Sequence, residues 1–239
     1  EQISTKDLPS PHTSQIQDAT YSGISLSDYS SHHEAFDVFS SSIVDWDYNH
    51  LKGFIKEICV WADANRQEAI LLLTKMIDRN YPTGNIRRSS LLTLCDSSLD
   101  QIFSSIASKS CDSYIHNKVI GDSSPDRRTV VVNADDYEIE GRSSLALELV
   151  RLISEGWHNL LLYNCKGHRF IANGFGPESE HVSIEVYGSS GDYLASGLDG
   201  VRLVVHGNGQ DQLGQILKSG TLVVHGDVGQ TFMYGAKGG

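Results

Sequence analysis

The chain has 239 residues, of which 39% are hydrophobic and 21% charged, ordinary values for a globular protein with a real core. Its formal net charge of −11 argues against a surface that attracts nucleic acid or an anionic membrane. No apolar run approaches the roughly 20 residues that span a membrane, and no secretory leader is recognisable. We therefore expect a soluble, cytoplasmic protein that binds neither nucleic acid nor membranes.

The four cysteines are scattered along the chain, and no two of them form a Cys-x-x-Cys pair. This spacing gives no support for a zinc or iron–sulfur site within the chain. Scattered cysteines fit a reducing compartment better than a disulfide framework. The sequence thus predicts no metal and no cofactor in this chain.

Residues 1–34 are rich in Ser, Thr, Asp and Gln, and their few apolar residues follow no sustained period. This composition is typical of a flexible arm, or of an extended segment that lies over another part of the molecule. His32 and His33 fall in this segment, and we expect them to be solvated.

Residues 35–128 are predicted to be helical. One helix follows from apolar residues at offsets 0, 3, 4, 7 and 8 from Leu51, and a second begins after Asn65 and stops before Pro82. A third is expected to start near Ser97. Residues 121–128 have the composition of a linker.

Residues 129–164 are predicted to form a strand, a helix and a strand. "TVVVN" (129–133) and "NLLLYN" (159–164) are the strands, and the intervening helix stops at Gly156, which suits a left-handed backbone. This order predicts a crossover between parallel strands that caps the C-terminal region. The carboxylates of "NADDYE" (133–138) have no histidine or lysine partner in register, so we interpret them as solvated.

Residues 165–239 contain a repeat of nineteen residues, most visible in "LVVHG" at 203–207 and again at 222–226. Five columns keep their residue type over three copies. They are Ile184, Leu203 and Leu222; Val186, Val205 and Val224; Gly188, Gly207 and Gly226; Leu194, Leu213 and Phe232; and Leu198, Leu217 and Ala236.

A fixed period near 20 residues indicates a solenoid. The dense glycines disfavour helices, because each interior glycine costs about 1 kcal/mol, and they suit corners that need positive φ. The predicted fold is therefore α+β: a helical N-terminal region and a strand–helix–strand cap, followed by a right-handed parallel β-helix. An antiparallel sandwich with glycine turns is the alternative, but it does not explain a period kept to the residue. We expect the coils to continue beyond Gly239 or a second polypeptide to cover the open end.

Three other interpretations of the repeat are weaker. "GNGQDQLG" lacks the third glycine of a dinucleotide fingerprint and the lysine of a P-loop, and its partial match to calcium-binding repeats has the wrong period. His206 and His225 share a column and should stack on the outer face, where an exposed ladder is favoured over a metal site. Asp192 and Asp211 also share a column, and aspartates at corners usually accept backbone amides.

The segments "VYGSSGDYLASGLDG", "VVHGNGQDQLGQILKSG" and "VVHGDVGQTFMYGAKGG" resemble the GXGXG domain at the C-terminal end of the glutamate synthase large (alpha) subunit, above all its stand-alone relatives. One of the subunits of formylmethanofuran dehydrogenase has a similar repeat. The preceding strand–helix–strand also resembles the stand-alone type, so the resemblance covers about residues 129–239. Residues 1–128 resemble no family that we can name.

The resemblance implies a β-helix scaffold without catalytic residues, part of a glutamate synthase-type oxidoreductase of glutamate biosynthesis and nitrogen metabolism. FMN, an iron–sulfur cluster and the amidotransferase cysteine are then expected in partner subunits, and the chain either binds these partners or self-associates. An accessory component of a formylmethanofuran dehydrogenase-type enzyme is one alternative. A carbohydrate-active β-helix enzyme is the second.

Overall fold

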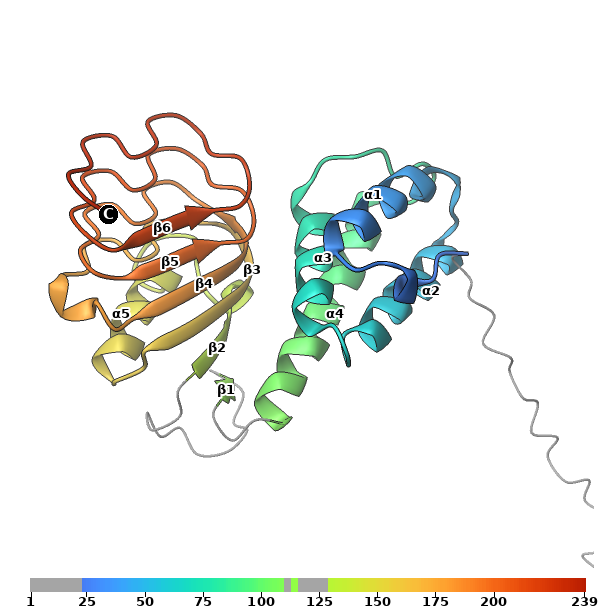
Figure 1. The fold of residues 1–239 in the computed structure, drawn as a ribbon, viewed down its shortest axis with the longest axis horizontal. Helices are drawn as coiled ribbons and strands as arrows, with labels where there is room; N and C mark the ends of the chain where they lie inside the picture. Colours follow the sequence, from blue (N-terminus) through green and yellow to red (C-terminus); the bar gives the residue numbers. More distant parts are fainter. Residues whose placement is uncertain (1–22, 110–112, 116–128) are drawn as a thin grey trace, which may run out of the picture.

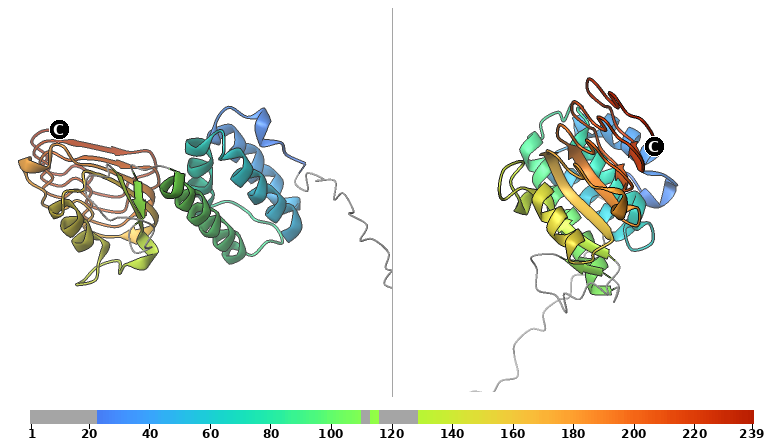
Figure 2. Two further views of the ribbon diagram at one scale, coloured as in Figure 1. Left: turned by 90° about the horizontal axis from the view of Figure 1, so that it is seen from below. Right: turned by 90° about the vertical axis from the view of Figure 1, so that its left-hand side faces the viewer.

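The computed structural model describes residues 23–109, 113–115 and 129–239. It has a helical part and a part built on a parallel sheet, which lie side by side (Figures 1 and 2). The helices are α1 (His32–Ser42), α2 (Tyr48–Trp61), α3 (Arg66–Asp78), α4 (Arg88–Lys109) and α5 (Leu145–Ser154). The strands are β1 (Ser113–Ile115), β2 (Thr129–Asn133), β3 (Asn159–His168), β4 (Ser183–Ser190), β5 (Arg202–Val205) and β6 (Thr221–Val224).

The six strands form one sheet in sequence order, from β1 at one edge to β6 at the other, and every neighbouring pair is parallel. Helix α5 connects β2 to β3, so the predicted strand, helix and strand are present with parallel strands. Gly156 after α5 has φ +98°, in the left-handed region that favours glycine.

The predicted β-helix is wrong, because the described residues form a single parallel sheet with helices, an α/β architecture, and not the several sheets of a β-helix. Within the segments that return the chain from one strand to the next, every second residue can have a left-handed backbone. Examples are Tyr193, Ala195 and Gly197, with φ of 62°, 59° and 71°. A strand needs φ of about −120° at every residue. These segments therefore cannot form further strands.

The return segments nevertheless stack on one another through backbone hydrogen bonds. Tyr193 donates to the Asp211 carbonyl oxygen of the following turn at 3.1 Å, and Ala195 donates to Ile171 of the preceding turn at 2.8 Å. Each strand with its return segment therefore makes a nineteen-residue turn that lies on the preceding one. We call residues 182–239 the stacked turns.

The column of Gly188, Gly207 and Gly226 is explained mainly by close packing between successive turns, and less by a need for positive φ. A Cβ atom on Gly207 would lie 2.3 Å from the Gly188 carbonyl oxygen, and one on Gly226 would lie 2.4 Å from the Gly207 carbonyl oxygen. Only Gly188 of this column has positive φ, at 129°. The expectation that these glycines serve positive φ is therefore wrong for Gly207 and Gly226.

Two cores form on opposite faces of the sheet. Helices α1–α4 make a helical layer whose core includes Val131, Tyr163 and Tyr187 from the sheet. The opposite face buries Val130, Leu160 and their neighbours against α5 and the return segments. The alternation follows from the two-residue period of strands.

The region predicted to be helical differs from its prediction in three places, one of which is strand β1 at Ser113–Ile115, within the range 35–128. Helix α1 begins at His32, inside the expected arm, and Ser31 caps it by accepting from the Glu34 amide. Helix α4 starts nine residues before the expected Ser97, at Arg88, so the connection from α3 is shorter than expected. The expected arm at 1–22 and the expected linker at 121–128 lie outside the described residues.

Candidate functional site between the helical layer and the sheet

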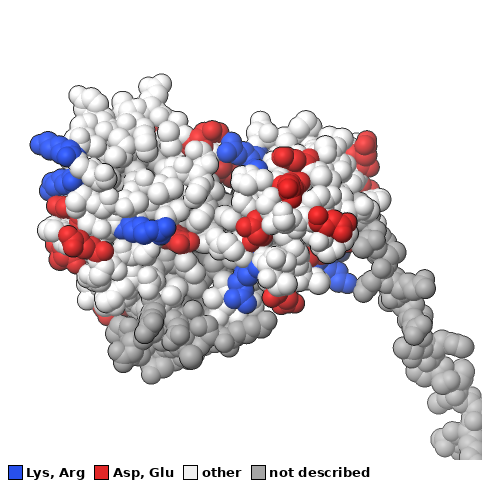
Figure 3. All heavy atoms as spheres, viewed as in Figure 1, with Lys and Arg blue, Asp and Glu red and all other residues white. Residues whose placement is uncertain are grey.

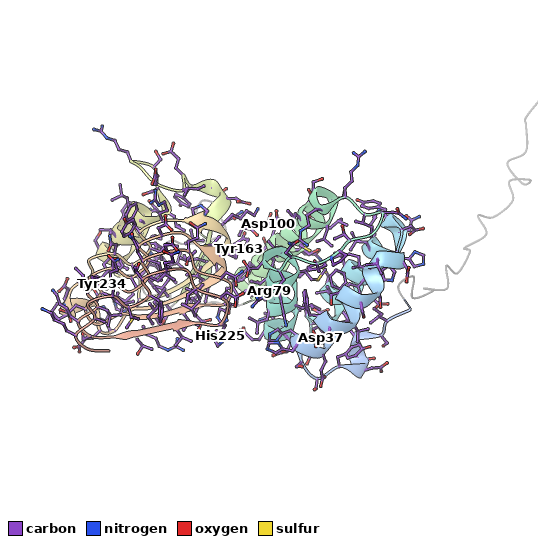
Figure 4. The ribbon with its side chains drawn as sticks, turned by 90° about the horizontal axis from the view of Figure 1, so that it is seen from above. Asp37, Arg79, Asp100, Tyr163, His225 and Tyr234 are labelled. Carbon is purple, nitrogen blue, oxygen red and sulfur yellow. The ribbon has the colours of Figure 1, made fainter. Side chains whose placement is uncertain are left out.

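Polar and aromatic side chains line the contact between the helical layer and the sheet. Asp100, Tyr163, Arg79 and His225 all lie along this contact, whereas Asp37 and Tyr234 lie away from it (Figure 4). The sheet side comes from the carboxyl ends of β2–β6, which is where ligands bind in open parallel sheets. This contact is the region that we consider as a functional site.

Lys166 joins the helical layer to the end of β2. Its ammonium group donates to Asp96 of α4 and to Asp135, each at 2.9 Å. Burial lowers the pKa of Lys166, but the hydrogen bonds that its ammonium group donates to both carboxylates outweigh burial and hold the pKa above its usual value. The carboxylate cluster of residues 133–138 therefore has a lysine partner, and the expectation of plain solvation is wrong for Asp135.

The missed signal is that Lys166 is on the neighbouring strand. β2 and β3 are paired, with Asn133 opposite Tyr163, so residues shortly after Tyr163 reach the same corner as residues shortly after Asn133. Pairing the two predicted strands in parallel is sufficient to place Lys166 and Asp135 at the same carboxyl end, and therefore near each other.

A second group of polar side chains surrounds Asp100. The Tyr163 hydroxyl donates to the Asp100 carboxylate at 2.7 Å, and Asn133 Nδ2 donates to the same oxygen at 3.4 Å. Burial, and then the hydrogen bond to Asp100, raises the pKa of Tyr163 far above its usual value. Tyr163 is therefore a hydrogen-bond donor at neutral pH and not a phenolate base.

The orientation of the two amides in this group follows from their partners. Asn133 Oδ1 accepts from the Asp135 backbone amide and from Asn164 Nδ2, at 3.2 Å each. Asn164 is buried, and its Oδ1 atom has no hydrogen-bond partner among the described residues. One Asp96 oxygen is also buried without a partner in the described part of the chain.

Next along the contact, three rings stack in a row across the strands. The Tyr187 and His206 ring centroids are 4.4 Å apart, and those of His206 and His225 are 5.3 Å apart, with nearly parallel planes. Glu185 accepts from the Tyr187 hydroxyl at 2.9 Å and contacts His206 Nε2 at 3.2 Å. His206 therefore has a carboxylate partner, and only 10% of its side chain is exposed, contrary to the expectation of an exposed ladder.

Asp78, the last residue of α3, ties the helical layer to the stacked turns. Its carboxylate accepts from the Ser189 hydroxyl and from the Asn208 backbone amide, the latter at 3.0 Å. Burial raises the pKa of Asp78 above its usual value of 3.8. The adjacent Arg79 pairs with Asp227 of the last turn at 2.7 Å.

The side chains of this region are poorly suited to nucleophilic or redox chemistry. Burial raises the pKa of the Cys95 and Cys165 thiols far above the usual range, which keeps both thiols protonated and unreactive. His168 is buried and neutral: burial lowers its pKa, and its ring accepts from the Lys166 amide at 3.2 Å. Among the described residues, no three His, Cys, Asp or Glu side chains are placed to hold a metal ion.

The structure places the predicted repeat residues as direct neighbours across the sheet and the return segments. Val186 pairs with Val205, and Val205 pairs with Val224. Leu194 and Leu213 are fully buried in the core of the stacked turns, whereas Phe232 of the same column is 42% exposed. These residues form core and not a site.

The remaining predicted candidates have structural partners. Asp192 accepts from the Asp211 amide at 3.0 Å, and Asp211 accepts from the Gln230 amide at 2.7 Å, as expected of corner aspartates. His32 is not merely solvated: its ring contacts Glu68 of α3 at 2.8 Å. The His33 ring contacts Lys75 at 2.9 Å.

Comparison with known proteins adds no assignment: no family model, no curated protein and no solved structure matches this chain. Within the part of the chain that the structure describes, no helix is long and apolar enough to cross a membrane.

Proposed function

We propose that this chain is a non-catalytic structural component of a glutamate synthase-type oxidoreductase, one that holds flavin-containing synthase and amidotransferase parts in position. The proposal begins from the resemblance of residues 129–239 to the GXGXG domain. FMN, the iron–sulfur cluster and the amidotransferase cysteine then belong to partner subunits.

The observation that supports the proposal is that polar groups of the stacked turns are engaged in holding one turn on another. Asp192, Asn208 and Asp211 each accept a backbone amide from the residue one repeat further along the chain. Carboxylates used in this way are unavailable as general acids or nucleophiles, which weighs against a carbohydrate-active enzyme. The buried, protonated thiols of Cys95 and Cys165 agree with a structural role.

The helical layer adds a second reason. Asp78, Lys166 and Tyr163 tie it to the sheet through hydrogen bonds, so the two parts form a joined body that presents two different surfaces. Acidic side chains gather on the helical layer, whereas the end of the stacked turns over β6 has few charges (Figure 3). A component that positions two partners needs two such surfaces.

The test is reconstitution with purified subunits from the source organism. The chain is mixed with the flavin-containing synthase subunit and the amidotransferase subunit, complex formation is followed by light scattering, and glutamate formed from glutamine and 2-oxoglutarate is measured. We expect a ternary complex and glutamate formation that requires the chain, and no turnover by the chain alone. Turnover by the isolated chain, or a stable complex only with a molybdenum or tungsten enzyme, would contradict the proposal.

A further inference from the structure

Five polar side chains join α4 to the carboxyl ends of β2 and β3. Lys166 donates to Asp96 and Asp135, each at 2.9 Å. The Asp135 backbone amide donates to Asn133 Oδ1 at 3.2 Å, and Asn133 Nδ2 donates to Asp100 at 3.4 Å. Asp100 lies one helical turn after Asp96 on α4, so the contacts close on themselves. We call these five residues the polar cluster, and it contains three carboxylates and one ammonium group.

Two buried oxygen atoms at the polar cluster, Asn164 Oδ1 and Asp96 Oδ1, have no hydrogen-bond partner among the described residues. Asn164 is only 4% exposed, and its Nδ2 donates to Asn133 at 3.2 Å. Because Oδ1 and Nδ2 belong to one planar amide group, the unpartnered oxygen also lies beside Asn133. Buried acceptors without a partner are rare in folded proteins and indicate a bound water or ion.

The charge of the polar cluster favours a cation over water. Both unpartnered atoms accept hydrogen bonds and have no proton to donate. Burial, and after it the charges of Asp135 and Asp100, raise the pKa of Asp96 above its usual value in spite of the hydrogen bond from Lys166. A water molecule would satisfy the two oxygens but leave this excess of negative charge, whereas a cation satisfies the oxygens and balances the charge.

The available oxygen atoms indicate an ion of single charge. Calcium takes six to eight oxygen ligands, several of them from carboxylates, and magnesium demands a near-ideal octahedron. In the described part of the chain, no three acidic, histidine or cysteine side chains are placed around one point for such an ion. An amide oxygen and a carboxylate that also accepts from Lys166 instead suit a weakly charged ion such as potassium, whose hydration shell carbonyl oxygens can replace.

We infer that the polar cluster and Asn164 form a binding site for a monovalent cation, potassium or sodium, with Asn164 Oδ1 and Asp96 Oδ1 as ligands and water completing the shell. Asp96 belongs to α4 and Asn164 to β3, so the ion joins the helical layer to the sheet. The inference depends on the side chains of this site and is independent of the proposed function.

The test is thermal unfolding of the full chain in KCl, NaCl and choline chloride at one ionic strength, which screens surface charges equally. Choline is too large for a buried site. KCl or NaCl at tenfold its dissociation constant should raise Tm by about 4 °C above the value in choline chloride. The ion with the larger rise is the preferred one, and broadening of the sodium-23 NMR resonance, reversed by KCl, measures binding directly.

Two variants should change cation binding in opposite directions. Asp96→Asn keeps an acceptor for Lys166 but removes a charged ligand, so it should weaken binding by about tenfold, equivalent to about 1.4 kcal/mol. Lys166→Gln removes the competing ammonium group and should strengthen binding by about the same factor. The matched control is Asp37→Asn, which removes the same charge from an exposed position on α1 away from the cluster (Figure 4) and should leave binding unchanged. Circular dichroism confirms that each variant is folded.

Two results would overturn the inference. The first is the same Tm in all three salts together with an unbroadened sodium-23 resonance, which would show that water alone satisfies the two oxygens. The second is an equal loss of the cation effect in Asp96→Asn and Asp37→Asn, or no loss in either, which would place the bound cation elsewhere. If Asp96→Asn does not fold, the sodium-23 measurement on the unchanged chain and on Lys166→Gln decides, and weaker binding by Lys166→Gln contradicts the site.

Discussion

The helical layer and the stacked turns bury their cores by different physical means. In the helical layer, large side chains fill the space: Phe39 stacks on Phe54 at 5.2 Å and meets Trp46 at 5.7 Å. In the stacked turns, the backbones themselves come close, and glycine at 207 and 226 leaves no room for a Cβ atom. The first region should therefore tolerate loss of volume poorly, and the second should tolerate gain of volume poorly.

The largest effect is expected in the helical layer. Phe54→Ala should lower the free energy of unfolding by about 4 kcal/mol, because it removes a fully buried ring and leaves a cavity. Denaturant unfolding measures this loss. Leu147→Ala on α5, where 54% of the residue is exposed, is the control and should change stability little. Equal losses in the two variants would show that volume does not decide stability here.

The matching change in the stacked turns adds one carbon. Gly207→Ala should lower the free energy of unfolding by about 3 kcal/mol, because the new Cβ atom overlaps the Gly188 carbonyl oxygen. Gly174→Ala is the control: its Cβ atom meets nothing within 4 Å, and only its φ of +71° is unfavourable. That strain alone should cost about 1 kcal/mol. A Gly207→Ala loss no greater than the control would disprove the close-packing explanation.

The connection between the two regions at Asp78 gives an intermediate effect. Asp78→Ala should cost about 2 kcal/mol, because it leaves the Asn208 amide and the Ser189 hydroxyl without their acceptor. Denaturant unfolding of the variant at neutral pH measures this cost.

Asp78→Asn should have the opposite sign. Burial raises the pKa of Asp78, so its contribution to stability is present below pH 3.8 and is lost as the pH rises through the folded-state pKa. An amide avoids this cost and can still accept from Asn208, so stability at neutral pH should rise by under about 1 kcal/mol, since water screens the half-buried group. A loss of stability in Asp78→Asn would refute the statement that burial of the charged Asp78 carboxylate is unfavourable at neutral pH.

The smallest effect concerns two histidines, His33 in the helical layer and His168 at the end of β3. Burial lowers the pKa of His168, and burial, His32 and Lys75 lower that of His33, from 6.5 in both cases. The unfolded chain then binds protons more strongly, so stability falls as the pH drops below the usual histidine pKa of about 6.5. Denaturant unfolding over a pH series that brackets this value should show a shallower fall in His168→Gln and in His33→Gln.

The additivity of these two variants sharpens the comparison. If the two histidines act independently, the double variant should reduce the slope of the free energy of unfolding against pH by the sum of the two single-variant reductions. A double variant no different from either single variant would show that one histidine alone is responsible.

Much of the helical layer could be predicted from the sequence. The apolar spacing from Leu51 and the boundaries at Asn65 and Pro82 correspond to α2 and α3, because a helix is set by local periodicity and local breakers. The start of α4 was missed because the spacing of Leu91 and Cys95, both fully buried, was not included in the pattern. His32 was misplaced for another reason: its partner, Glu68, is 36 residues away.

The candidate site could be predicted only in part. "NADDYE" was recognised as a cluster at the end of a strand, but its partner Lys166 and the contact with Asp96 on α4 depend on how strands and helices are packed together. The Asp78 bond to Asn208 joins residues 130 positions apart, which no local pattern shows.

The sequence by itself determined the nineteen-residue register, which reappears as the strand pairing of Val186, Val205 and Val224. It did so because residues that contact their own equivalents must keep their type. Only the tertiary structure decided that the return segments contain alternating left-handed residues and leave one parallel sheet. Backbone φ depends on contacts between successive turns, and residues such as Tyr193 and Gln212 do not reveal a positive φ by their type.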